Sequence, residues 1–246
     1  MESDPRWLAG VDGCRGGWVA VFLEAGEHDR AEAAVFADFG RLLADPRAQG
    51  TIAIDMPIGL PATGQPGGRT AEHQVRALIG PRRRSVFGIP ARAAVFAHPQ
   101  GYAAVCALAR RMSSPPCAPS LQAYHIFPRI IEIDTALRGD AALARRVFEV
   151  HPELSFRAMN GAPLAWPKKE KGRLGEGAAL RRALLLGQGY RAEFLDHLPK
   201  GGARRDDFFD ACAAAWSAAR IAAGEAIVLP AEPEFDEFGL PMRICG

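Results

Sequence analysis

The segment Gly10–Val21 places one carboxylate at the end of an apolar run that glycines join to a second apolar run. The carboxylate is Asp12, and Gly13, Gly16 and Gly17 follow it. Two short apolar runs separated by a Gly-rich turn predict a β-hairpin, and Asp is uncommon inside strands. Asp12 therefore either stabilises the turn by accepting backbone N–H groups or binds something positively charged. Acids at comparable positions elsewhere in the chain would favour the second interpretation.

Length and composition limit the class of protein. The chain has 246 residues, of which 48% are hydrophobic and 24% charged, as in an ordinary globular protein. It contains no apolar run of about 18 residues, and the N-terminus carries acids instead of a basic segment. Five scattered cysteines without a Cys-x-x-Cys pair indicate free thiols in a reducing compartment. We expect a cytoplasmic protein without a membrane partner.

Strand and helix patterns in the first 55 residues predict an α/β fold. Strands are expected at 7–11, 18–23 and 31–36, followed by a helix that Asp38 caps and a short strand that ends at Asp55. A strand that follows a helix usually returns parallel to a neighbour, so this fourth strand is expected beside the first. Asp12 and Asp55 then lie at the same edge of the sheet, where ligands bind in such folds.

Residues 58–146 form an expected helical and loop insertion between the fourth and fifth strands. Helices are predicted at 70–79, 102–111 and 121–137, the last interrupted near Pro128. Four arginines, Arg82 to Arg84 and Arg92, surround a short apolar segment; they form either a solvated loop or a surface that contacts phosphate. Because no polar linker bounds this stretch, we expect a single domain over residues 1–246.

A fifth strand is expected at 146–153, with Glu149 and Glu153 on one side. Burying Glu149 in an apolar strand is costly unless it is paired or faces a cation, so structural and functional roles stay open for both glutamates. His151 has no Cys or His partner at metal-ligand spacing and is expected to form hydrogen bonds instead. The basic loop 166–173 is interpreted as a solvated segment.

The Ala-rich segment 204–220 predicts a helix with small side chains that can lie close to a sheet. Asp206 is expected to be the N-cap, and Asp207 suits the positive end of the helix, but Asp210 on the same face adds like-charge repulsion. A bound cation would turn that repulsion into coordination. Asp12, Asp55, Asp207 and Asp210 are thus candidate ligands for Mg²⁺ or Mn²⁺. Two such ions, about 3.5–4 Å apart, would bind a phosphodiester.

Five motifs in this chain resemble a family described as predicted RNase H-like nucleases. In order, they are Val-Asp-Gly-Cys-Arg-Gly-Gly-Trp, Ile-Asp-Met-Pro-Ile-Gly-Leu-Pro, Arg-Arg-Arg-Ser-Val-Phe, Glu-Val-His-Pro-Glu and Asp-Asp-Phe-Phe-Asp-Ala, running from Val11 to Ala211. The element order and the acids also resemble the RuvC-type branch of the ribonuclease-H-like superfamily. The resemblance implies a mixed five-stranded sheet flanked by helices and a nuclease activity. It implies metal-ligand roles for Asp12, Asp55, Asp207 and Asp210.

The expected function is hydrolysis of phosphodiester bonds in DNA or RNA by water, assisted by two metal ions. The four aspartates, with Glu149 and Glu153, are the candidate catalytic residues. Substrate contacts are expected from the hairpin and the basic loop, at Gly13, Arg15, Gly16, Arg83, Arg84, Ser85 and Arg92. Two alternatives stay open: an ATP-dependent phosphotransferase of the actin and sugar-kinase type, and a nucleic-acid-binding protein without catalysis.

Overall fold

The computed structural model describes residues 7–24, 27–170 and 173–246. Their contacts form two compact units. The first comprises Met1–Asp55, Arg146–Ile227 and Cys245–Gly246, and the second comprises Met56–Arg145 and Val228–Ile244. The second unit thus holds the predicted insertion together with a C-terminal segment. The single-domain organisation over 1–246 stays a prediction.

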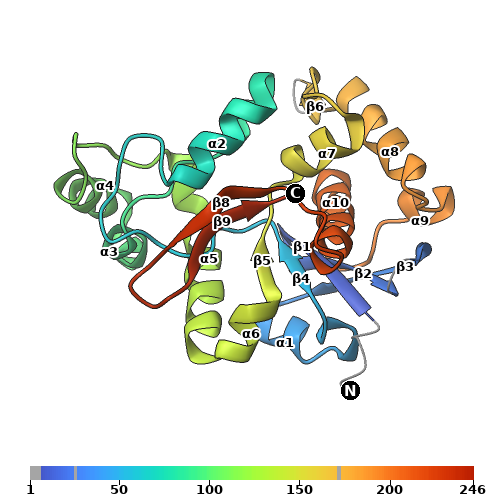
Figure 1. The fold of residues 1–246 in the computed structure, drawn as a ribbon, viewed down its shortest axis with the longest axis horizontal. Coiled ribbons are helices and arrows are strands. Elements are labelled where there is room, and N and C mark those ends of the chain that lie inside the picture. Colours follow the sequence, from blue (N-terminus) through green and yellow to red (C-terminus); the bar gives the residue numbers. More distant parts are fainter. Residues whose placement is uncertain (1–6, 25–26, 171–172) are drawn as a thin grey trace. The chain divides into compact units, whose positions relative to one another are not determined.

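The first unit is built on a mixed five-stranded sheet (Figure 1). Its strand order is β3-β2-β1-β4-β5. The first three strands are antiparallel, whereas β4 is parallel to both β1 and β5. This arrangement confirms the predicted α/β class and is consistent with a ribonuclease-H-like fold. The strands are β1 (Trp7–Cys14), β2 (Gly17–Glu24), β3 (Glu27–Phe36), β4 (Ile52–Ile54) and β5 (Val147–Glu149).

Three strand boundaries differ from the sequence prediction by three residues or more. The strand β1 continues through Asp12 to Cys14 rather than ending at residue 11. The strand β3 begins at Glu27 rather than at residue 31, because an edge strand tolerates polar side chains on its exposed positions. The predicted strand 146–153 ends at Glu149, and helix α7 (Pro152–Asn160) follows. Pro152 and Glu153 occupy the first turn of α7, where both residue types are favoured. Glu149 and Glu153 therefore do not share the side of one strand.

The remaining elements of the first unit surround this sheet. Asp38 caps α1 as predicted, because its side chain accepts a hydrogen bond from the Arg41 amide at 2.7 Å. The helices are α1 (Phe39–Leu43), α8 (Glu176–Gly187), α9 (Ala192–Asp196) and α10 (Arg205–Ala222), and β6 (Lys169–Glu170) pairs antiparallel with β7 (Arg173–Leu174). None of the helices in the described ranges is long and apolar enough to cross a membrane.

Helix α10 lies directly on β1 (Figure 1). A Cβ atom added to Gly10 would lie 1.9 Å from the Ala215 amide nitrogen and 2.3 Å from the Ala211 carbonyl oxygen. The alanines on this part of α10 are fully buried. Small side chains on the helix and a glycine on the strand thus bring the two backbones together, as the Ala-rich pattern predicted.

The second unit is mainly helical. Its elements are α2 (Thr70–Ile79), α3 (Arg92–Phe96), α4 (Tyr102–Arg111), α5 (Leu121–Gly139), most of α6 (Ala141–Arg146), and the paired strands β8 (Val228–Phe235) and β9 (Pro241–Cys245). Helix α5 runs through Pro128, so the predicted interruption is wrong. Phe127 and Ile130 are fully buried beside Pro128, and this packing offsets the lost backbone hydrogen bond.

Arg92 joins three segments in the interior of the second unit. Its guanidinium donates to Asp134 of α5 at 2.6 Å and to Asp236, in the turn after β8, at 2.5 Å. Both carboxylates are buried, so the charges satisfy one another away from water. Arg92 thus links α3 to α5 and to the β8–β9 turn.

We expect Gly10→Ala to destabilise the protein by about 1–3 kcal/mol or more, because the new methyl group forces α10 away from β1. Urea unfolding followed by tryptophan fluorescence measures the loss. Gly187→Ala, at the end of α8, is the matched control, since a Cβ there meets nothing within 4 Å. Equal stabilities for the two variants would contradict this account of the α10–β1 contact.

Candidate metal centre

Two aspartates lie at the carboxyl ends of neighbouring parallel strands. Val11 of β1 is in register with Ile54 of β4, and each is followed by an aspartate. The Asp55 amide donates to the Val11 carbonyl at 2.9 Å, which extends the pairing by one residue. Asp12 and Asp55 therefore meet at one edge of the sheet, as the sequence predicted.

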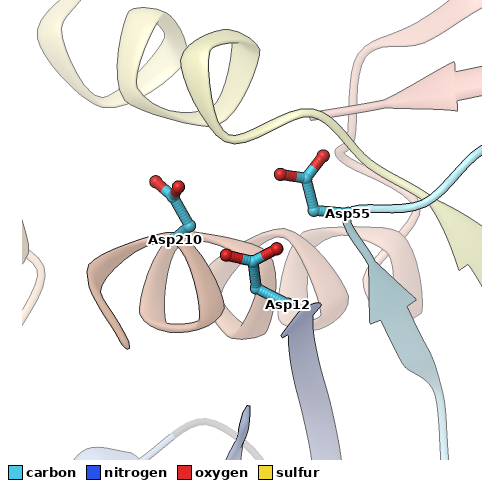
Figure 2. A group of neighbouring side chains, drawn as sticks. All are labelled: Asp12, Asp55 and Asp210. Carbon is cyan, nitrogen blue, oxygen red and sulfur yellow. The ribbon is translucent and has the colours of Figure 1, made fainter. Parts of the chain in front are cut away.

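Asp210 brings a third carboxylate to this edge from α10. Figure 2 shows the three side chains converging from β1, from the end of β4 and from the helix. One oxygen from each of Asp12, Asp55 and Asp210 lies within 4.8 Å of the other two. Asp210 is 5% exposed, whereas the other two aspartates are partly buried. We call these three residues the acid triad.

Asp12 also stabilises its own turn. Its Oδ1 atom accepts a hydrogen bond from the Gly13 amide at 2.7 Å. The two interpretations raised by the sequence are therefore compatible: one carboxylate oxygen bonds to the backbone while the side chain belongs to the acid triad.

Burial and mutual repulsion disfavour the ionised form of the acid triad. Burial, then Asp55 and Asp210, raise the pKa of Asp12 well above its usual range. Burial is also the main cause that raises the pKa of Asp55 to about 6 and that of Asp210 to about 7. Lys168 partly counters these shifts by favouring the charged carboxylates. A divalent cation would favour ionisation in the same way and more strongly.

Lys168 is the residue that sequence reasoning missed. Its Nζ donates to Asp210 Oδ2, and the nearby acids Asp210, Glu153 and Asp55 raise its pKa further above the usual lysine value. The interpretation of residues 166–173 as a solvated loop is therefore wrong at Lys168. Residues 171–172 lie outside the described residues. No local pattern marks this lysine, because its partner is 42 residues away in the sequence.

Glu153 is held by an arginine that the sequence analysis did not single out. Arg181 Nη2 donates to both carboxylate oxygens of Glu153, at 2.6 and 2.7 Å, and both side chains are 1% exposed. Because a buried arginine occupies both oxygens, the structure gives Glu153 a role in packing α7 against α8. Its charge still raises the pKa of Asp55. His151 caps α7, accepting from the Glu153 amide at 3.2 Å, as its expected hydrogen-bonding role requires.

The other predicted acids lie outside the acid triad. Asp207 Oδ2 accepts from the Arg204 amide at 3.0 Å and so caps the start of α10, although its charge also raises the pKa of Asp12. The helix begins at Arg205 with Arg204 as its N-cap, so the N-cap role predicted for Asp206 is wrong. Glu149 is buried at the end of β5. Catalytic roles for Asp207, Glu149 and Glu153 stay predictions.

Close packing and backbone conformation explain the glycines of the β1–β2 turn. A Cβ atom on Gly16 would lie 1.8 Å from the Gly201 carbonyl oxygen, so this glycine admits a neighbouring loop. Gly17 has a φ of 120° and approaches the Phe36 carbonyl closely. Arg15, between Cys14 and Gly16, is exposed at the tip of the β1–β2 turn. Substrate contacts by Gly13, Arg15 and Gly16 stay predictions.

The predicted basic loop lies in the second unit, in the 3₁₀ helix Gly80–Ser85. Arg83 and Arg84 are exposed, and Ser85 donates to the Arg82 carbonyl at 2.8 Å. Arg92 differs from these residues, because its guanidinium is engaged by the buried carboxylates of Asp134 and Asp236. Phosphate contacts by Arg83, Arg84 and Ser85 stay predictions, as does that by Arg92, whose guanidinium already has two buried carboxylate partners.

The acid triad has the properties of a site for a hard divalent cation. Its donors are carboxylate oxygens, which Mg²⁺ and Mn²⁺ prefer. Asp210 Oδ1 is buried and receives no hydrogen bond from any residue that the structure describes. A buried carboxylate oxygen without a donor is costly, and a metal ion would satisfy it. Asp12, Asp55 and Asp210 are thus able to hold a metal ion.

We expect the metal-free protein to lose stability as the pH rises from about 4 to 7. The folded pKa values of Asp55 and Asp210 lie above the usual aspartate value of 3.8, so the folded state binds more protons than the unfolded state in this window and deprotonation penalises folding. Thermal unfolding in EDTA should give a lower midpoint at pH 8 than at pH 5, and Asp210→Asn should reduce this difference by several °C, about 2–4 °C per kcal/mol.

Glu27→Gln is the control for this experiment, because Glu27 is an exposed residue of β3 paired with Arg30. It should leave the difference between pH 5 and pH 8 unchanged. An Asp210→Asn protein with the full wild-type difference would show that the acid triad is not its source.

Arg181→Met should destabilise the protein by about 3–5 kcal/mol, since it leaves the Glu153 carboxylate buried without its partner. Combining it with Glu153→Gln should recover part of the loss, as a double-mutant cycle in urea would measure. Arg182→Met is the matched control: it breaks an exposed pair with Asp196 and should cost less than about 1 kcal/mol. Additive losses in the cycle would contradict a direct Arg181–Glu153 interaction.

Comparisons with known proteins place the chain in a family whose activity is not established. No curated protein and no solved structure shows significant similarity to it. One family model, described as a protein of unknown function (DUF429), matches residues 10–235. This match includes the acid triad, Lys168 and the Glu153–Arg181 pair. The chain therefore belongs to the DUF429 family.

Proposed function

We propose that this protein is a divalent-metal-dependent nuclease that hydrolyses phosphodiester bonds in nucleic acid. The observation that carries the proposal is the convergence of Asp12, Asp55 and Asp210 at the carboxyl edge of β1 and β4, with a buried Asp210 oxygen that has no donor among the described residues. The strand order, which is consistent with the ribonuclease-H-like fold that the motifs resemble, supports it.

The residues of the acid triad have separable roles in this reaction. Asp12 and Asp55 are fixed by the β1–β4 pairing, whereas α10 holds Asp210, so all three carboxylates are oriented before substrate arrives. When bound, Mg²⁺ or Mn²⁺ supplies positive charge that polarises the phosphodiester and favours ionisation of the attacking water. The chain itself holds that charge and excludes water from the buried side of the cluster.

Hydrolysis consumes one water molecule. The water oxygen forms a new bond to phosphorus while the bond from phosphorus to the leaving oxygen breaks. One proton of the water ends on the leaving oxygen, and the second ionises from the new phosphomonoester. The products are a phosphomonoester and a free hydroxyl group.

Substrate binding in this proposal uses exposed arginines. Arg15 lies on the β1–β2 turn close in sequence to Asp12, and Arg83 and Arg84 are exposed in the second unit. The guanidinium group offers two parallel donors to phosphate oxygens, and phosphate contacts are the common element of nucleic-acid binding. A formal net charge of only +2 requires such contacts to be local rather than spread over the surface.

Asp12→Asn should reduce metal-dependent cleavage of DNA or RNA by about 10²-fold or more, because the amide keeps the turn but loses the charge. Cleavage of labelled single- and double-stranded DNA and RNA, with Mg²⁺, with Mn²⁺ and with EDTA, measures the effect. Asp29→Asn is the control and should cleave at the wild-type rate. Full activity in Asp12→Asn, or in EDTA, would refute the proposal.

The same preparations address the phosphotransferase alternative. Calorimetric titration with ATP and Mg²⁺ should show no tight nucleotide site in a nuclease. Tight ATP binding together with an absence of cleavage would favour the phosphotransferase instead. Binding of nucleic acid without any turnover, under all metal conditions, would favour a non-catalytic binding protein.

A further inference from the structure

Lys168 places a positively charged side chain against the acid triad. Its Nζ donates to Asp210 Oδ2, and its side chain is 25% exposed. The charges of Asp55 and Glu153 also act on it. The ammonium group thus lies within the same cluster of carboxylates that would hold a metal ion.

The backbone that carries Lys168 is held in place by α8. Arg181 Nη1 donates to the Trp166 carbonyl at 3.2 Å and to the Gly177 carbonyl at 2.8 Å. A Cβ atom on Gly177 would lie 1.9 Å from the Pro167 carbonyl oxygen, so residues 166–167 rest directly on the first turn of α8. Arg181 is fully buried. Lys168 therefore extends from an anchored segment, unlike a lysine on a solvated loop.

The charges of the cluster balance one divalent cation. The acid triad carries three negative charges when ionised, and Lys168 contributes one positive charge. The bidentate pair of Glu153 with Arg181 carries no net charge, so it is left out of this balance, although the Glu153 carboxylate still acts on Asp55 and Lys168. Two negative charges remain. One divalent ion neutralises them, whereas two divalent ions would leave an excess of positive charge in a partly buried site.

The spacing of the oxygens also suits one ion. One oxygen from each of the three aspartates lies within 4.8 Å of the others, so a small movement lets all three bind one ion, whose oxygen ligands at about 2.0–2.1 Å lie no more than about 4.2 Å apart. Asp210 Oδ2 accepts a hydrogen bond from Lys168 Nζ, whereas the buried Asp210 Oδ1 has no donor among the described residues.

We propose that Lys168 takes the place of a second metal ion: the site binds one divalent cation through Asp12, Asp55 and Asp210 Oδ1, and the Lys168 ammonium supplies the remaining positive charge. This inference rests on the proposed nuclease function, and it replaces the two-ion arrangement that the sequence led us to expect. Lysine donates hydrogen bonds as a compact point charge with three donors, so the donors that Asp210 does not use are suited to a phosphate oxygen of the substrate.

The test counts Mn²⁺ ions per chain. Isothermal titration calorimetry, together with electron paramagnetic resonance of free Mn²⁺, gives the stoichiometry without any cleavage assay. The wild type should bind one ion. Lys168→Met should bind two, the second more weakly, because the vacated position regains a net negative charge. Lys168→Arg should bind one ion, and so should the control Lys200→Met, which changes an exposed lysine elsewhere in the first unit.

Two ions in the wild type, no ion in the wild type, or one ion in a folded Lys168→Met protein would each overturn the inference. If Lys168→Met fails to fold by circular dichroism, Lys168→Gln, which keeps a polar side chain without the charge, replaces it and should likewise bind two ions. A wild type that binds one Mn²⁺, with Lys168→Met binding two, but cleaves no nucleic acid would refute the nuclease proposal while the one-ion site stands. Cleavage by a wild type that binds two Mn²⁺ ions would support the nuclease proposal and refute the one-ion inference.

Discussion

The contact between the backbones of β1 and α10 is the constraint on which the site depends. Gly10 lies two residues before Asp12, and it meets Ala211, the residue directly after Asp210. The same close approach therefore sets the separation of two carboxylates that are almost 200 positions apart in the chain. A larger residue at Gly10 or at Ala211 would displace α10. Asp210 would move with the helix, because α10 alone holds it at the edge of the sheet. Ala211, which packs on Gly10, and its neighbour Asp210, which belongs to the acid triad, thus link the packing of α10 to the geometry of the site.

Gathering several acids at such an edge carries an electrostatic cost that the surroundings only partly offset. The raised pKa values of Asp12, Asp55 and Asp210 record this cost. Two cations near these acids interact with them differently. Arg181 forms a closed bidentate pair with Glu153, whereas Lys168 donates to Asp210 and leaves the triad with a net negative charge. Arg181 therefore neutralises a buried acid beside the acid triad, whereas Lys168 reduces the net negative charge of the acid triad itself.

Local sequence patterns predicted the parts of the fold and site that depend on neighbouring residues. Alternation of apolar residues, a helix cap at Asp38 and the parallel return of β4 were enough to place Asp12 and Asp55 at one edge. Lys168 and Arg181 could not be found in this way, because their partners lie 42 and 28 residues away. The helix that begins at Pro152 had a local signal, since proline and glutamate favour a first helical turn, but the apolar run before it predicted a longer strand.

The origin of the site in four separate segments couples metal binding to folding. Asp12, Asp55, Lys168 and Asp210 come from β1, the end of β4, the segment before β6 and α10, and an unfolded chain holds them far apart. A cation that binds only the assembled cluster stabilises the folded state by mass action. The raised carboxylate pKa values mean that such binding also displaces protons. The repulsion among the carboxylates that destabilises the metal-free protein therefore also favours binding of a divalent ion. In our proposal, Lys168 limits how many ions the cluster binds.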